Sequence, residues 1–247
     1  MVGFMKFRLS RKKHIPIFYL KDSKILDREW YPYEILDLTR TLIEKRKWRV
    51  ADDGIRLEQT KAQLVLLPQH ASLFAHEWGI WRRWYAPTSL KGKIVLDVGA
   101  GCGETAFFYF REGARKVICV EPDKAALECL EENAGRHSWN VEVLAEEFRV
   151  EMLKECRFDF MKMDGEGCEA ELLKVTRLPT EAIVESHSSE LTQTLAERLN
   201  AKVVANLDPK TSLLHIPRLI SNGLASNHLA VTSNSAIGDS KLASMNS

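Results

Sequence analysis

The sequence lacks a surplus of charge of either sign, because 35 Lys and Arg residues face 34 Asp and Glu residues, for a formal net charge of +1. A balanced chain offers no electrostatic argument for nucleic-acid binding. It also lacks any apolar run that approaches the roughly 20 residues of a membrane-spanning helix. The basic first residues are not followed by the apolar segment of a signal peptide. These absences predict a cytoplasmic protein with no membrane span.

Cysteine pairs of the C-x-x-C type are missing as well. Three of the cysteines lie in or beside apolar runs, which favours reduced packing residues over a disulfide framework or a zinc site. The five are Cys102, Cys119, Cys129, Cys156 and Cys168.

What the chain does have is enough apolar sequence for one sizeable core, since 45% of its 247 residues are hydrophobic. We predict an N-terminal extension over residues 1–90, a main domain over 91–219 and a disordered, Ser- and Asn-rich tail over 220–247. Residues 1–30 are basic. For them a solvated arm is preferred over an RNA-contacting segment, because a short basic run is weak evidence for RNA.

Local patterns in the extension predict a small α+β unit. Helical spacing covers 33–47, and an Asp-Gly turn at 52–54 lies between apolar segments at 48–50 and 55–57, which is typical of a β-hairpin. Residues 63–68 add one further strand. Such an extension is expected to shape the acceptor side of the site.

Tryptophan recurs every three residues at Trp78, Trp81 and Trp84, which predicts an aromatic stripe on a helix. Large aromatic area favours core packing over a substrate-stacking wall. The stacking wall is kept as an alternative because Arg82 and Arg83 stand among the rings, where they could meet an anionic acceptor.

From residue 91 the chain alternates between strand and helix patterns, as a doubly wound α/β sheet requires. The expected strands are 95–98, 117–120, 141–144, 158–163, 182–185, 202–205 and 212–216, and the expected helices are 106–110, 122–133 and 191–199.

The first of these strands runs into three alternating glycines, Gly99, Gly101 and Gly103. Glycine allows a tight turn and lets a ligand lie against the main chain. The helix that follows offers free N–H groups at its start. The pattern therefore predicts a nucleotide-type pocket.

Glu121 ends the next strand, where a carboxylate can bind both hydroxyls of a ribose. Nicotinamide dinucleotides and S-adenosylmethionine compete as ligands. The dinucleotide fingerprint is G-x-G-x-x-G, whereas the glycines here alternate strictly. Asp97, before the turn, suits an ammonium group better than a phosphate. Both features favour S-adenosylmethionine.

These residues resemble a known family. The run from Asp97 to Thr105 resembles motif I of the class I S-adenosylmethionine-dependent methyltransferases, apart from Cys102, where the FkbM family more often has Asn. Glu121-Pro122-Asp123 resembles their ribose-binding motif. Residues 161–169 resemble the D-x-E-G-x-E signature of the FkbM family, and 183–187 the E-x-H strand end that often follows it.

The resemblance implies a Rossmann-like, doubly wound, seven-stranded mixed sheet and an O-methyltransferase that uses S-adenosylmethionine on a hydroxylated small molecule or sugar. It also implies a set of cofactor-binding residues: Asp97, Gly99, Ala100, Gly101, Gly103, Glu104, Thr105, Glu121, Pro122, Glu146 and Asp164.

Methyl transfer to a hydroxyl requires alignment with the methyl carbon and a base that takes the proton. His187 is the preferred base, since its ordinary pKa lies near working pH. Asp164 or Glu166 is expected to orient it or to hold the acceptor. The structural alternatives are a satisfied strand-end histidine and, for Glu169, a helix cap.

Other functions stay open at this stage. Carboxylates near the fourth and fifth strand ends permit Mg²⁺ against a vicinal diol, but Glu185-Ser186-His187 lacks an Asp-Asn pair, so no metal is predicted. An RNA methyltransferase is supported only by basic residues. The remaining alternatives are a non-catalytic cofactor-binding module and, more remotely, a nicotinamide oxidoreductase.

Overall fold

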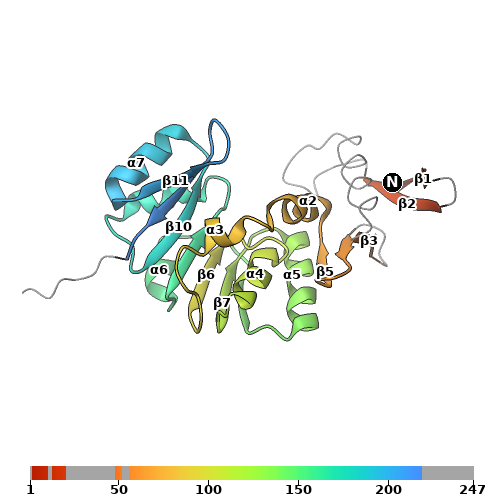
Figure 1. Ribbon diagram of the computed structural model, residues 1–247, viewed down its shortest axis with the longest axis horizontal. Helices are drawn as coiled ribbons and strands as arrows, with labels where there is room; N and C mark the ends of the chain where they lie inside the picture. The colour runs from red at the N-terminus through yellow and green to blue at the C-terminus, as the bar shows by residue number, and fades with distance from the viewer. Residues whose placement is uncertain (1, 11–12, 21–47, 52–55, 219–247) are drawn as a thin grey trace, which may run out of the picture.

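A seven-stranded mixed sheet forms the centre of the computed structural model, which describes residues 2–10, 13–20, 48–51 and 56–218 (Figure 1). The strand order is β11-β12-β10-β9-β6-β7-β8. The five strands β10, β9, β6, β7 and β8 run parallel to one another. Strand β12 is antiparallel to both β10 and β11. The seven-stranded α/β sheet expected from the resemblance is confirmed. The strands are β6 (Ile94–Val98), β7 (Lys116–Val120), β8 (Val141–Leu144), β9 (Phe160–Met163), β10 (Glu181–Ser186), β11 (Lys202–Asn206) and β12 (Ser212–Ile216).

The central strands are apolar because both faces of the sheet are covered. Val95 packs into one apolar cluster and Leu96 into the other, as the alternation of side chains along a strand requires. The edge strands are less buried than the central ones: β8 is only partly buried, and β11 is mostly exposed. An edge strand has one neighbour and less cover, which accounts for the difference.

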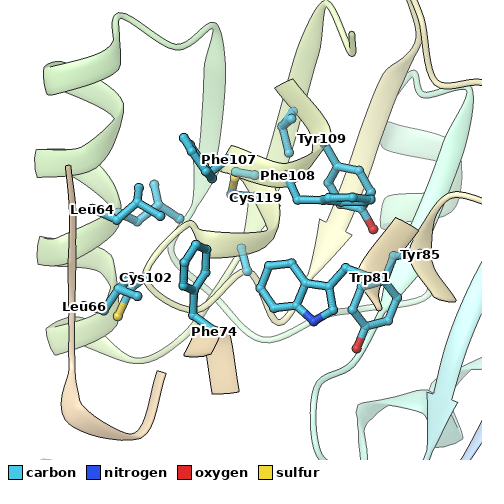
Figure 2. Close-up of a cluster of buried hydrophobic side chains, with 14 of the residues drawn as sticks. Leu64, Leu66, Phe74, Trp81, Tyr85, Cys102, Phe107, Phe108, Tyr109 and Cys119 are labelled. Atoms are coloured by element: carbon cyan, nitrogen blue, oxygen red, sulfur yellow. The ribbon is translucent and has the colours of Figure 1, made fainter. Parts of the chain in front are cut away.

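Helices cover the two faces. The first cluster includes residues of α4 (Glu104–Arg111) and α5 (Lys124–His137), and Figure 2 shows Phe107, Phe108 and Tyr109 from α4 within it. The second includes residues of α6 (Met152–Glu155), the 3₁₀ helix η1 (Cys168–Lys174) and α7 (Ser189–Leu199). Within the described ranges, no helix has both the length and the apolar character that a membrane crossing needs.

Helix α5 begins two residues later than the sequence predicts and ends four residues later. Asp123, rather than Pro122, is the residue before the helix, and its carboxylate accepts a hydrogen bond from the Ala126 N–H at 2.7 Å. Carboxylate caps of this kind are strongly favoured at helix starts. The expected stop of α4 near Gly113 is confirmed, since Gly113 has a positive φ of 90°.

The predicted hairpin is present as part of a three-stranded antiparallel sheet of β3 (Trp48–Val50), β4 (Leu57–Gln59) and β5 (Leu64–Leu66). Strand β4 begins at Leu57, two residues later than expected. The predicted Asp-Gly turn at 52–54, the helix at 33–47 and the tail at 220–247 lie outside the described residues.

Residues 2–10 and 13–20 form an antiparallel pair, β1 (Val2–Ser10) with β2 (Lys13–Leu20), which the sequence analysis did not predict. Aromatic and β-branched residues are frequent in both segments, and such residues favour strands. The sequence interpretation relied on the basic residues of this region and did not use this strand preference.

The tryptophan stripe is split between two helices. Helix α2 (Pro68–Glu77) ends before Trp78, and α3 (Trp81–Tyr85) starts after Gly79, a residue type with low helix propensity. The core interpretation holds for Trp81, which is 2% exposed and makes an edge contact with Phe74 (Figure 2). Arg82 and Arg83 are exposed.

Asn133 of α5 joins the three-stranded sheet to the main domain. Its amide accepts from the Val65 N–H at 2.8 Å and donates to the carbonyl oxygens of Val65 and Cys102, both at 2.8 Å. The side chain is fully buried. Three backbone groups therefore depend on one side chain for their hydrogen bonds.

Replacing Asn133 by alanine leaves those three backbone groups buried and unpaired. We expect the Asn133→Ala variant to lose ~3 kcal/mol of unfolding free energy in urea denaturation. Glu131→Ala changes an exposed residue of the same helix and should stay within ~0.5 kcal/mol of the parent protein. Equal losses in the two variants would contradict the bridging role of Asn133.

Candidate active site

A cavity of about 890 Å³ opens at the carboxyl ends of the central strands. Strand β6 lies between β7 and β9 in the sheet. The chain passes from β6 to β7 on one side, and it returns from β8 to β9 on the other side. Ligands of open α/β sheets bind at such a switch point. The volume lies in the range of small-molecule sites. The walls come from α2 and α3, from the loops after β6, β7, β8 and β9, and from the start of η1.

Most of the predicted site residues meet in this cavity. Those that line it are Gly99, Gly101, Glu104, Thr105, Glu121, Pro122, Asp164 and Glu166. Asp97 is fully buried beneath the glycine loop, and Ala100 and Gly103 shape that loop through a mutual backbone hydrogen bond of 3.0 Å. His187 stands beside Asp164.

The glycine loop approaches Asp164 and His70 so closely that a side chain at Gly99 or Gly101 would overlap with them. A Cβ on Gly99, which has φ of 70°, would lie 1.8 Å from the backbone oxygen of Asp164. One on Gly101 would lie 2.6 Å from the ring of His70. Gly103, also at positive φ, is the residue before α4. The loops after β6 and β9 therefore pack backbone to backbone.

Asp97 anchors the loop from below. Its Oδ2 accepts a hydrogen bond from the Thr105 hydroxyl at 2.6 Å, and its Oδ1 lies 3.5 Å from the Lys162 ammonium. Burial raises the pKa of Asp97 to about 6, against the opposing effect of Lys162. The side chain is a structural acid of the loop as well as a candidate cofactor contact.

Lys162 is the main residue that sequence reasoning missed. It is 1% exposed, donates to the Gly99 carbonyl oxygen at 2.9 Å, and lies 3.6 Å from Asp164 Oδ2. Burial opposes its charge, but Asp97 and Asp164 outweigh burial and raise the pKa of Lys162 above its ordinary value. A lysine within the apolar strand Phe160–Met163 was the available signal, since such a charge needs a buried partner.

His70, from α2, was also missed. Its Nδ1 lies 2.6 Å from Glu104 Oε1, and the pair covers the glycine loop. Burial opposes protonation, yet Glu104 raises the pKa of His70 above its ordinary value. Glu104 is 6% exposed, and among the described residues its Oε2 has no hydrogen-bond partner. An unpaired buried carboxylate oxygen is costly unless a ligand donor meets it.

Glu121 holds the loop and faces the cavity. Its Oε2 accepts from the Gly101 N–H at 2.8 Å and its Oε1 from the Asp123 N–H at 2.9 Å. Burial raises the pKa of Glu121. Each oxygen keeps a second lone pair, which leaves the carboxylate able to accept from a ligand.

The structure places Glu146 away from the cavity, contrary to the sequence interpretation. Its side chain is exposed and lies 3.1 Å from Arg149. The loop after β8 contributes Glu147 and Phe148 to the lining instead. An exposed neighbouring arginine draws Glu146 outward, and a register difference of one residue in a loop cannot be read from the sequence.

At the other end of the cavity, Asp164 belongs to the lining, and Glu185 and His187 lie next to it outside the lining. His187 Nε2 lies 3.7 Å from both Asp164 Oδ1 and Glu185 Oε1, beyond hydrogen-bond distance. The Tyr85 hydroxyl donates to Glu185 Oε2 at 3.0 Å. Glu166 stands in the exposed part of the loop, with a positive φ of 43°.

Glu169 does more than cap a helix. Its Oε1 accepts the His187 backbone N–H at 3.1 Å and lies 3.2 Å from Nδ1 of the same ring, while its Oε2 accepts the Gly167 N–H. The hydrogen bond to Glu169, with Asp164 and Glu185 nearby, raises the pKa of His187 to about 9. Burial and the charge of Asp164 raise the pKa of Glu185 to about 7.

Two groups in the described part of the chain place three potential metal-ligating atoms within 4.8 Å of one another: His70, Cys102 and Glu104, and Asp164, Glu185 and His187. Neither is a convincing metal centre. The Cys102 thiol is fully buried and accepts the Leu67 N–H, and the second group already lies against the Lys162 ammonium.

Comparison with known proteins gives limited sequence similarity. No family model matches the chain. Ribosomal protein L11 methyltransferase of Symbiobacterium thermophilum is 34% identical over 61 residues, which are 25% of this chain and 20% of that protein. The chain thus spans about a fifth of the length of the curated relative that it matches.

Solved structures with a similar arrangement include two methyltransferases. The ribosomal protein L11 methylase of Lactobacillus delbrueckii subsp. bulgaricus has a TM-score of 0.45 and 20% identity, over 61% of this chain and 79% of that one. A 16S rRNA N2 methyltransferase of T. thermophilus, in complex with AdoMet and guanosine, has a TM-score of 0.42 and 15% identity, over 88% of this chain and 51% of that one.

The close approach of Gly99 to Asp164 predicts a large cost for a side chain at this position. Gly92 has nearly the same φ, 72°, but no atom within 4 Å of an added Cβ. We expect Gly92→Ala to lose ~1–2 kcal/mol of unfolding free energy through backbone strain alone, and Gly99→Ala to lose ~2 kcal/mol more through overlap. Similar urea midpoints for the two variants would show that the loops separate freely.

Proposed function

We propose that this protein is an S-adenosylmethionine-dependent methyltransferase that methylates a hydroxyl group of a small molecule or sugar. One observation carries the proposal: a single cavity joins a glycine loop with ribose-type and ammonium-type acceptors to a cluster of acid and base side chains. The resemblance of the two sequence motifs and the curated methyltransferase relative support it.

The residues at the glycine-loop end fit the cofactor. Glu121 would accept hydrogen bonds from the ribose hydroxyls, and the unpaired Glu104 Oε2 would accept one from the ammonium of the methionine part. Gly101 leaves room that a Cβ would fill. Glu147 and Phe148, which line the cavity after β8, would contact the cofactor where the sequence interpretation expected Glu146.

The bound cofactor supplies a methyl group on a sulfonium, which is already a good leaving group. The protein's own contribution is therefore alignment of the acceptor and control of its proton. Asp164 and Glu166 line the end of the cavity where this control is needed, and His187 lies 3.7 Å from Asp164. Trp81 and Tyr85 wall that end and exclude water from it.

The charge of the lining favours a neutral acceptor over a nucleic acid or a dinucleotide. Eight Asp and Glu residues line the cavity, while its lysine, Lys162, is already held by two carboxylates and a carbonyl oxygen. Phosphate groups would meet a negative field there. The RNA methyltransferase alternative rests on Arg82 and Arg83, which are exposed but do not line the cavity.

Calorimetric titration of the purified protein with S-adenosylmethionine, S-adenosylhomocysteine and NAD tests the proposal. We expect the two adenosyl ligands to bind in the micromolar range and NAD to bind at least tenfold more weakly. Transfer of labelled methyl to glycerol, methyl glucoside and catechol, with RNA as a comparison, then tests the acceptor class. No adenosyl binding, or a preference for NAD, would refute the proposal.

Glu121 is predicted to contribute strongly to cofactor affinity. Replacing it by glutamine removes the charge while keeping the size, so the affinity for S-adenosylhomocysteine should fall about 10- to 100-fold. Glu146→Gln, a change at an exposed side chain in the loop after β8, should leave affinity within about twofold. Circular dichroism of both variants separates lost binding from lost folding, and equal affinities would remove Glu121 from the site.

A further inference from the structure

The gap between Asp164, Glu185 and His187 has the dimensions of one small group. The ring nitrogen Nε2 of His187 lies 3.7 Å from an oxygen of each carboxylate, and the three atoms lie within 4.8 Å of one another. These separations are too long for direct hydrogen bonds, yet one oxygen atom between them would be within hydrogen-bond reach of all three. The cluster is thus arranged around a guest atom.

Charged and polar neighbours orient the three side chains around this gap and influence their protonation. Lys162 faces Asp164 from β9, and Tyr85 of α3 donates to Glu185. Glu169, at the start of η1, binds His187 Nδ1, so a ring N–H points at Glu169 and the charged ring is stabilised. Asp208, in the turn before β12, adds a further negative charge near the ring.

We propose that Glu185, and not His187, takes the proton of the acceptor hydroxyl, and that His187 acts in its protonated form as a donor to the same oxygen. This assignment rests on the proposed methyl transfer. Tyr85 is a positioning residue, because its hydroxyl occupies Glu185 Oε2 and leaves Oε1 turned toward the gap.

The step balances without a further reactant. The hydroxyl oxygen attacks the methyl carbon and forms the C–O bond, while the S–CH₃ bond breaks and its electron pair stays on sulfur. The hydroxyl proton passes to Glu185 Oε1. The His187 N–H stabilises the negative charge that develops on oxygen as the proton leaves.

The direction of the pKa shifts agrees with this geometry. With a pKa of about 7, Glu185 is a carboxylate that can accept a proton near neutral pH. With a pKa of about 9, His187 already carries its proton there and has no free lone pair on Nε2. The pKa near neutral pH that the sequence interpretation expected of His187 therefore belongs to Glu185.

A divalent cation in the gap is the competing occupant. It would lie beside the Lys162 ammonium, which is 3.6 Å from Asp164, and would have to displace the proton of His187. Both effects disfavour it. A requirement for a metal ion is therefore one of the results that would overturn the assignment.

The first test follows protonation by NMR in the full-length protein saturated with S-adenosylhomocysteine. Glutamate carboxyl carbons and histidine ring nitrogens are labelled, and Glu185→Gln and His187→Gln assign the two signals. We expect the Glu185 carboxyl to titrate near pH 7 while His187 stays protonated to about pH 9. Titration of Glu185 below about pH 5, or of His187 below about pH 7, would overturn the proposal.

The second test measures methyl transfer to the best acceptor of the glycerol, methyl glucoside and catechol panel as a function of pH. Wild type should be most active between about pH 7 and 9. Glu185→Gln should lose about 100-fold in kcat and the rise through pH 7, whereas His187→Gln should keep that rise and lose the decline near pH 9. Glu190→Gln, an exposed control, should match wild type.

Each failure has its own signature. If Glu185→Gln keeps more than a third of the wild-type rate with the same profile, or if a chelator abolishes transfer, the assignment of Glu185 is wrong. If wild type does not bind S-adenosylhomocysteine in the calorimetric titration, the proposed function itself fails. Affinity for S-adenosylhomocysteine should stay within about twofold in Glu185→Gln, which separates the two cases.

Discussion

The ammonium of Lys162 is the constraint on which the rest of the site depends. It is buried between the carboxylates of Asp97, near the end of β6, and Asp164, directly after the parallel strand β9. It also donates to the carbonyl oxygen of Gly99. Without this charge the buried carboxylate of Asp97 and the partly exposed carboxylate of Asp164 would face each other across the sheet, at a cost in solvation and repulsion. With it, the loops after β6 and β9 can pack backbone to backbone, and that packing requires glycine at position 99.

This arrangement makes the two ends of the cavity parts of one electrostatic system. Asp97 lies under the glycine loop, Asp164 lies beside the acceptor cluster, and Lys162 is shared between them. A cationic cofactor and a protonated His187 both gain from the surplus of carboxylates. Burial and the charge of Asp164 raise the pKa of Glu185 against the opposing effects of Lys162, Tyr85 and His187, so the proton affinity of the proposed acceptor depends on groups from separate parts of the chain.

How far the sequence could predict this depends on the range of the contacts. Apolar runs and the glycine turn are local signals, and they located the seven strands of the sheet and the loop at Gly99. Partners that meet only after folding left no such signal, as with His70 and Glu104, or Tyr85 and Glu185, which are 100 positions apart. Glu146 shows the opposite failure, since a loop register error of one residue turned a plausible ligand group toward Arg149.

Helices α2 and α3 of the N-terminal extension line the cavity and pack against the central sheet. Trp81 and Tyr85, both labelled in Figure 2, belong to one apolar cluster. The same cluster includes Val95 and Phe160 of the central strands. The same helices supply His70 at the glycine loop and the Tyr85 hydroxyl that donates to Glu185, the proposed proton acceptor. A boundary drawn at residue 90 from the change in sequence pattern separates groups that act together. Acceptor choice and proton control consequently share one wall, and a change in α3 that admits a new acceptor also alters the carboxylate expected to deprotonate it.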